Sequence, residues 1–398
     1  KNDNEFCAEL DNLARKFKDY HLQFSYETYS AKKIIDGAFR RYGDEYILAY
    51  LPKGEKNDQL LYKTKLLKIN DVPVEKVIKK ITPLILCENK YGFEMESAGF
   101  LTGRTTLIKA GIISDDDIEV KYTLENIETK EKVDINFPIS KSNSTEIERN
   151  NLAIPITFFY SDPSYNFYPM RTDRKYMSQE IDNDTYFIQL NGFYEDSNPN
   201  LQDFNQKVAN DFEKNNYKKL IIDLRYNPGG YGSIFDDLFN TIIKNYNKNK
   251  FDVYTLIGAK SASASILNAY RIEELFPNNT FVGTPPCQKP NFNAPVLEYY
   301  DYKNILGIEM VYSYGCYICD PKNPDALYPD ITIEETLDDW LNNYDRVLET
   351  VVSMPIDEEK LKTYPNANID FSDFKKWGKE GSIKVIFDKE DMKKWIGE

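Results

Sequence analysis

Apolar and polar residues alternate in two different ways along the chain, and this divides it into two main regions. Between residues 45 and 140 the apolar positions form short runs separated by turn residues, as in Tyr46–Leu51 and Ile118–Tyr122, which is typical of β-strands. From residue 185 onwards, strand-like runs alternate with segments of helical spacing, which favours a mostly parallel, layered sheet. The pattern predicts an α/β protein, or an α+β protein of several domains.

The second region gives the clearest set of predicted elements. Its predicted strands are Tyr186–Leu190, Leu220–Leu224, Val253–Ile257, Thr280–Val282 and Ile308–Tyr312. Its predicted helices are Leu201–Tyr217, Ile234–Tyr246, Ala264–Phe276 and a closing amphipathic helix over 336–353. In the first region, a short helix is predicted over Val74–Ile81. Helical spacing of Phe6, Leu10, Leu13 and Phe17 predicts a further helix over 4–20.

These patterns divide the 398 residues into five segments. We expect an N-terminal helical segment with the first strand (1–45), a β-rich module (46–140), a polar linker or covering segment (141–184), an α/β domain (185–355), and a C-terminal extension without an assigned role (356–398).

Charge and composition exclude several classes of partner. The 50 basic and 64 acidic residues give a net charge of −14, and nucleic acid is bound by basic surfaces. No apolar run approaches the ~20 residues that a membrane span needs. The chain begins at Lys1 rather than Met, and export is one reason for a processed N-terminus, so we expect a secreted, cell-surface or otherwise extracytoplasmic protein. Composition does not indicate an oligomeric state.

The five cysteines do not form a disulfide framework for a chain of this length. Cys316 and Cys319 have the spacing of a local disulfide or of half a zinc site, or they are plain thiols. A zinc site would need two more ligands, and the chain has a single histidine, His21. No cofactor motif is present, so we expect neither a metal nor a cofactor.

Two junctions between a strand and a helix carry candidate chemistry. At the first, a buried strand runs into the turn Asn227-Pro228-Gly229-Gly230, where glycines let backbone N–H groups face a cleft and hold an oxyanion. At the second, Ser261-Ala262-Ser263-Ala264-Ser265 precedes a helix, whose N-terminus favours negative charge and suits an acyl-transfer nucleophile. A tight turn and a helix cap would explain the same residues without catalysis.

A serine nucleophile needs a general base, and the sequence offers two. His21 is the only histidine, and Asp19 or a backbone carbonyl could orient its ring. Lys289 would serve if burial lowered its pKa. Most histidines and lysines have no catalytic role, so neither residue is decisive alone.

Taken in order along the chain, these segments resemble the tail-specific, C-terminal-processing peptidases, including their tricorn-like branch. The segments that carry the resemblance are Asp223–Gly230, Ser261–Ser265, the loop Val282–Lys289, Pro329–Ile331, Lys18–His21 and Leu66–Val74. The match at Asp-Leu-Arg-x-Asn-Pro-Gly-Gly is specific and the others are looser. The resemblance covers roughly residues 10–353.

The resemblance implies a serine endopeptidase that cleaves protein or peptide substrates. It implies a crotonase-like ββα catalytic core and a PDZ-like module at 46–140. It assigns the nucleophile to Ser263, the base to His21 or Lys289, and an orienting acid to Asp325. It also implies that the backbone amides of Gly229, Gly230 and Ala264 form the oxyanion hole. We favour His21 as base, because Asp-x-His matches the branch without a dedicated lysine and histidine has the better pKa at neutral pH.

Four positions depart from the pattern of the family. They are Ile266 after the nucleophile, Cys287 and Gln288 before the lysine, and Asn293, where a glutamine often stands. These departures leave open a catalytically inactive relative that binds peptides or proteins. A crotonase-like enzyme acting on acyl-thioesters is a third hypothesis, but the acidic composition offers no obvious basic pocket for its carrier.

Overall fold

The computed structural model describes residues 9–10, 13–26, 33–35, 37–52, 61, 63–141, 153–155, 174–197, 199–294, 297–301, 308–313, 315–342, 344–362 and 384–386. The chain divides into two compact units. Unit 1 comprises Lys1–Asn166, Tyr299–Val311 and Thr336–Tyr344, and unit 2 comprises Phe167–Glu298, Tyr312–Glu335 and Asp345–Glu398.

Unit 2 is built on a six-stranded sheet in the order β10-β11-β12-β13-β14-β18. Its strands are β10 (Tyr176–Glu180), β11 (Thr185–Leu190), β12 (Lys219–Asp223), β13 (Asp252–Ile257), β14 (Thr280–Gly283) and β18 (Ile331–Thr332). Neighbouring strands are parallel, except that β10 runs antiparallel to β11. β11, β12 and β13 are buried along their whole length, because helices cover both faces of the sheet.

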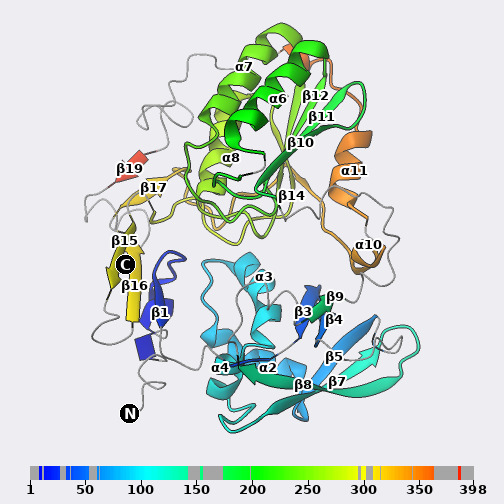
Figure 1. The fold of residues 1–398 in the computed structure, drawn as a ribbon, viewed down its shortest axis with the longest axis vertical. Coiled ribbons are helices and arrows are strands. Elements are labelled where there is room, and N and C mark those ends of the chain that lie inside the picture. The colour runs from blue at the N-terminus through cyan, green and yellow to red at the C-terminus, as the bar shows by residue number, and fades with distance from the viewer. Residues whose placement is uncertain are drawn as a thin grey trace. The chain divides into compact units, whose positions relative to one another are not determined.

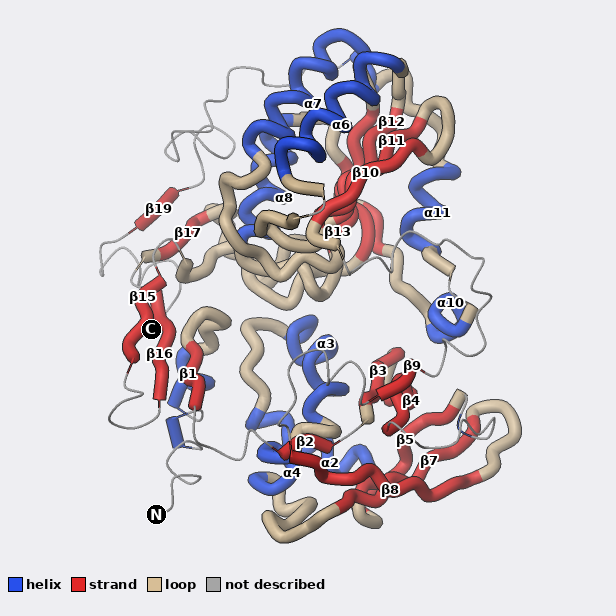
Figure 2. The backbone as a smooth tube through the Cα atoms, in the orientation of Figure 1, coloured by secondary structure: helices blue, strands red, loops and turns tan. Residues whose placement is uncertain are grey.

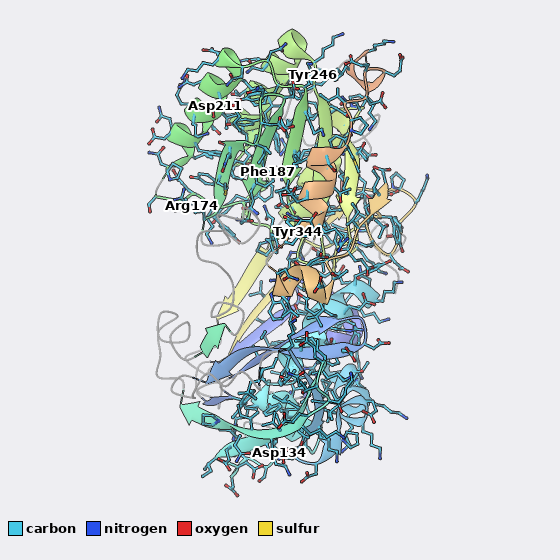
Figure 3. The ribbon with its side chains drawn as sticks, turned by 90° about the vertical axis from the view of Figure 1, so that its right-hand side faces the viewer. Asp134, Arg174, Phe187, Asp211, Tyr246 and Tyr344 are labelled. Atoms are coloured by element: carbon cyan, nitrogen blue, oxygen red, sulfur yellow. The ribbon has the colours of Figure 1, made fainter. Side chains whose placement is uncertain are left out.

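Three helices cover one face of this sheet and one helix covers the other (Figure 1). They are α6 (Leu201–Lys214), α7 (Asp236–Asn249) and α8 (Ala264–Leu275) on the first face, and α11 (Arg346–Ser353) on the second. Tyr246 of α7 belongs to the core of the first face, whereas Phe187 of β11 packs with Val347 and Leu348 of α11 (Figure 3). The prediction of a mixed α/β protein is confirmed.

Unit 1 contains an eight-stranded sheet and a set of short helices (Figure 2). Its main path is β2-β8-β7-β5-β4-β3, with β6 paired to β5 and β9 to β4. The strands are β2 (Lys33–Ile35), β3 (Ala38–Tyr42), β4 (Glu45–Pro52), β5 (Thr64–Ile69), β6 (Val72–Pro73), β7 (Glu119–Asn126), β8 (Lys132–Lys141) and β9 (Ala153–Pro155). The helices are α2 (Val74–Ile81), the 3₁₀ turn Thr82–Leu84, α3 (Lys90–Phe100), α4 (Arg104–Lys109) and α10 (Leu337–Leu341).

Two smaller sheets complete the described strands. One has the order β1 (Gln23–Tyr26), β16 (Ile308–Ser313), β15 (Leu297–Asp301), and the other pairs β17 (Cys316–Ile318) with β19 (Lys384–Ile386). No helix in the described part of the chain is both long enough and apolar enough to cross a membrane.

The structure differs from the predicted elements in several places. The strand predicted over Ile308–Tyr312 is β16, which lies in the small sheet with β1 and β15 and not in the sheet of unit 2. The single helix expected over 336–353 is two helices, because Thr336 caps α10 through a capping box and Asp345 caps α11 by accepting the Leu348 N–H. The segment 141–184, expected to be irregular, contributes β10 to the sheet of unit 2. Within the expected helix over 4–20, residues 9–10 and 13–17 are helical, and residues 1–8 and 11–12 lie outside the described residues. Beyond the 3₁₀ turn Lys360–Lys362 and β19, most of 363–398 also lies outside them.

Candidate active site

Ser263 stands immediately before α8 in a backbone conformation that residues with side chains rarely adopt. Its φ is 54° and its ψ is −122°. Its backbone N–H donates to Oε1 of Gln288 at 2.5 Å, and Gln288 is completely buried. A strained conformation persists only where its surroundings hold it in place, and such residues cluster at functional sites. The Gln288 side chain is one of the groups that hold Ser263.

The three serines of the run have different surroundings. The Ser261 hydroxyl donates to the Leu224 carbonyl at 2.8 Å and accepts the Gly258 N–H at 3.1 Å, so it connects two loop segments. The Ser265 hydroxyl is buried and has no hydrogen-bond partner in the described part of the chain. Ser263 is only partly buried. Of the three, Ser263 is therefore the one that solvent or a substrate could reach.

The two glycines of the Asn-Pro-Gly-Gly turn lie against this serine. Gly229 has a φ of +109°, and a Cβ built on it would lie 2.7 Å from Ser263 Cβ and 3.0 Å from the Ala264 nitrogen. Gly230 has a φ of +130°, and its Cβ would lie 2.4 Å from the Phe193 carbonyl oxygen. Both positions require glycine for conformation and for space. The turn and the start of α8 are therefore packed backbone to backbone.

The amides at this junction are not equivalent. The Gly229 N–H donates to Oδ1 of Asn227 at 2.9 Å and is already engaged. Within the described residues, the N–H groups of Gly230 and Ala264 have no hydrogen-bond acceptor. The Ala264 N–H also belongs to the first residue of α8, where the helix dipole favours negative charge. The arrangement can thus hold an oxyanion beside Ser263, with Gly230 and Ala264 as donors and without Gly229.

Asn227 fixes the geometry of the turn from inside the protein. It is fully buried, and its side chain donates to the Leu190 carbonyl at 2.8 Å, at the end of β11. Its own carbonyl accepts the Ala262 N–H at 3.0 Å. One asparagine therefore connects β11, the glycine turn and the serine loop.

Arg225 anchors the same segment on the opposite side. Its guanidinium donates to both carboxylate oxygens of Asp223 and to both of Asp345, at 2.7–3.0 Å, and all three side chains are buried. Burial alone would lower the pKa of Arg225, but the two carboxylates outweigh it and hold the pKa well above its ordinary value. Because Asp345 caps α11, the Asp-Leu-Arg segment ties the end of β12 to that helix.

The predicted bases lie in different units. His21 belongs to unit 1, while Ser263, Lys289 and Asp325 belong to unit 2. The Asp19 carboxylate accepts the backbone N–H of His21 at 2.9 Å. Burial lowers the pKa of His21 below its ordinary value of 6.5, and the charge of Asp19 opposes this shift. The Lys289 side chain is 37% exposed, and its Nζ lies 3.8 Å from Asp325 Oδ1, so it is not the buried lysine that a lysine base requires.

The described residues hold no cluster of three or more histidine, cysteine or acidic side chains that could bind a metal ion. Cys316 and Cys319 are both buried, and the local disulfide between them is not formed. Burial raises the pKa of the Cys319 thiol, so this thiol is a poor nucleophile.

Comparison with known proteins agrees with the resemblance seen in the sequence. The model of peptidase family S41 matches residues 184–251, which run from β11 through the Asp-Leu-Arg-x-Asn-Pro-Gly-Gly turn to the end of α7. The chain therefore resembles this peptidase family over the segment that supplies the glycine turn. No curated protein matches the sequence.

Several solved structures are similar at low identity. The photosystem II D1 C-terminal processing protease has 10% identity and a TM-score of 0.35 over 79% of this chain and 78% of that one. A variant of cpaf has 11% identity and a TM-score of 0.49 over 85% of each chain. A lipoprotein from Streptococcus agalactiae has 15% identity and a TM-score of 0.30 over 42% of this chain and 69% of that one. All three TM-scores are below 0.5, so the assignment of the site rests on the distances and hydrogen bonds described above.

Proposed function

We propose that the protein is a serine endopeptidase with Ser263 as nucleophile. The observation that carries the proposal is the contact between the Gly229-Gly230 turn and the strained Ser263, which lies beside two unengaged N–H groups, that of Gly230 in the turn and that of Ala264 at the start of α8. The S41 match supports a peptidase and includes this turn. The proposal includes the finer assignments of a crotonase-like core, a PDZ-like module at 46–140 and an extracytoplasmic location.

In the proposed mechanism a base takes the proton of the Ser263 hydroxyl while Oγ attacks the scissile carbonyl carbon. The negative charge that develops on the carbonyl oxygen is held by the Gly230 and Ala264 N–H groups. The C–N bond then breaks, and the protonated base returns its proton to the leaving amine. Water, deprotonated by the same base, hydrolyses the acyl-enzyme and restores Ser263.

The test of this function is peptide hydrolysis by wild type and two serine variants. Wild type should cleave unfolded casein, with fragments read by mass spectrometry. Ser263→Ala should lose at least about 1,000-fold in rate, because the nucleophile is gone. Ser265→Ala is the matched control, since it removes a buried hydroxyl without a partner only two residues away. Equal rates for wild type and Ser263→Ala would refute the proposal and favour a peptide-binding relative.

We propose His21 as the base, and the pH dependence of kcat/KM distinguishes it from Lys289. A histidine must be neutral to accept the proton, and burial lowers the pKa of His21. Activity should therefore be lost only as the pH falls through a value below 6.5. His21→Ala should remove this acid limb together with most of the rate, whereas Lys289→Met should leave both in place. If kcat/KM is instead lost as the pH falls through the alkaline range, and this loss disappears in Lys289→Met, the base is Lys289.

A further inference from the structure

Two exposed tyrosines of unit 2 form an aromatic pair. Tyr194 is 44% exposed and Tyr231 is 71% exposed, and their rings meet edge to face with centroids 5.9 Å apart. Tyrosine presents a large, rigid apolar surface at little entropic cost, which is why it is enriched where proteins bind partners. An exposed pair of this kind is suited to contact another molecule.

The backbone places this pair beside the proposed oxyanion donor. Phe193 and Gly230 form a parallel β-bridge, in which the Phe193 N–H donates to the Gly229 carbonyl and the Tyr231 N–H donates to the Phe193 carbonyl, each at 2.8 Å. A Cβ on Gly230 would lie 3.0 Å from Cε2 of Tyr194. The Tyr194 ring is therefore packed against Gly230, and Tyr231 follows Gly230 directly in the chain.

The pair rests on a rigid base. Phe193 is fully buried and packs edge to face on Phe235, with ring centroids 5.3 Å apart. The carbon chain of Lys175 lies next to Gly192, and its ammonium lies 5.9 Å from the centre of the Tyr194 ring. Because the bridge fixes the backbone of both tyrosines, their position relative to the Gly230 N–H is set before a substrate binds.

We propose that Tyr194 and Tyr231 form a substrate subsite that takes an aromatic or long apolar side chain of the peptide, close to the scissile bond. The inference rests on the proposed function, because it is the Gly230 N–H that would hold the scissile carbonyl. A residue whose carbonyl is bound at Gly230 has its own or a neighbouring side chain within reach of the two rings. Ring-to-ring and ring-to-methylene contacts then select substrates that carry such a side chain.

The test maps cleavage sites in a peptide library made by tryptic digestion of a bacterial lysate. Peptide ends that trypsin produced are not counted as cleavage sites. Wild type should prefer Phe, Tyr, Leu, Ile or Met at one fixed position beside the cut, and Tyr194→Ala and Tyr231→Ala should each reduce this preference about tenfold. Tyr231→Phe should keep it, since the ring remains. Tyr328→Ala, at a tyrosine of unit 2 that is 53% exposed, is the control and should also keep it.

Hydrolysis of p-nitrophenyl acetate separates this inference from the proposed function. Its acyl group has no side chain, so wild type should hydrolyse it whether or not the subsite exists, while Ser263→Ala should not. If wild type cleaves peptides and the alanine variants keep the same preference, the subsite is refuted and the peptidase stands. If wild type hydrolyses neither the peptides nor the ester, the proposed function fails and the subsite falls with it.

Discussion

Arg225→Met is expected to cost about 3–5 kcal/mol of the free energy of unfolding of unit 2, because it leaves Asp223 and Asp345 buried without their cation. Methionine fills most of the same volume, so the loss reflects the missing charge and hydrogen bonds rather than a cavity. The cap of α11 should weaken as well, since Asp345 holds both Arg225 and the Leu348 N–H. Denaturant unfolding followed by far-UV circular dichroism measures the change.

The control is Lys207→Met, in the same unit. Lys207 is half-exposed and pairs with Asp211 at 2.6 Å on α6, and exposed pairs of this kind contribute at most about 1 kcal/mol. Arg225→Lys should fall between wild type and Arg225→Met, because it restores the charge without the planar fork. An Arg225→Met protein as stable as the Lys207→Met protein would show that the buried network does not hold β12 to α11.

Gly229→Ala is expected to lower kcat/KM about 100-fold or more, because its methyl group would have to move Ser263. The new Cβ would meet Ser263 Cβ at 2.7 Å and the Ala262 oxygen at 3.0 Å, and neither is the flexible end of a side chain. The φ of +109° adds strain that glycine does not have. Steady-state hydrolysis of a quenched fluorescent peptide measures the loss.

A second positive-φ glycine separates backbone strain from displacement of the nucleophile. Gly111 has a φ of +63° and open space where a Cβ would be, so Gly111→Ala carries strain alone. It should cost about 1–2 kcal/mol of stability and leave kcat/KM unchanged. Retention of full activity in Gly229→Ala would mean that the turn and the serine are not coupled as described.

The sequence was informative wherever local patterns decide the structure. Val74–Ile81 was predicted as a helix and is one, and the helix expected from Ala264 begins at Ala264. The Asn-Pro-Gly-Gly turn was predicted to follow a buried strand, and it does follow β12. Each of these features depends on neighbours within a few residues, which hydrophobic spacing and turn chemistry report directly.

Contacts between residues far apart in the chain could not be predicted from local sequence patterns. Gln288 was counted as a departure from the family, yet it accepts the N–H of Ser263 from 25 positions away. The sequence pattern places Asp345 within one continuous helix, because nothing local marks its buried partner Arg225, which is 120 positions away. The resemblance assigns the Gly229 amide to the oxyanion hole, but this N–H donates to the side chain of Asn227, only two residues earlier. The roles of His21 and Lys289 stay predictions.

Covalent labelling with a fluorophosphonate shows whether Ser263 is an activated nucleophile. Folded wild type should be labelled, and peptide mapping should place the adduct on Ser263. Ser263→Ala should not be labelled, whereas Ser265→Ala should be. Absence of label from folded wild type, or an adduct on another residue, would contradict the proposed role of Ser263.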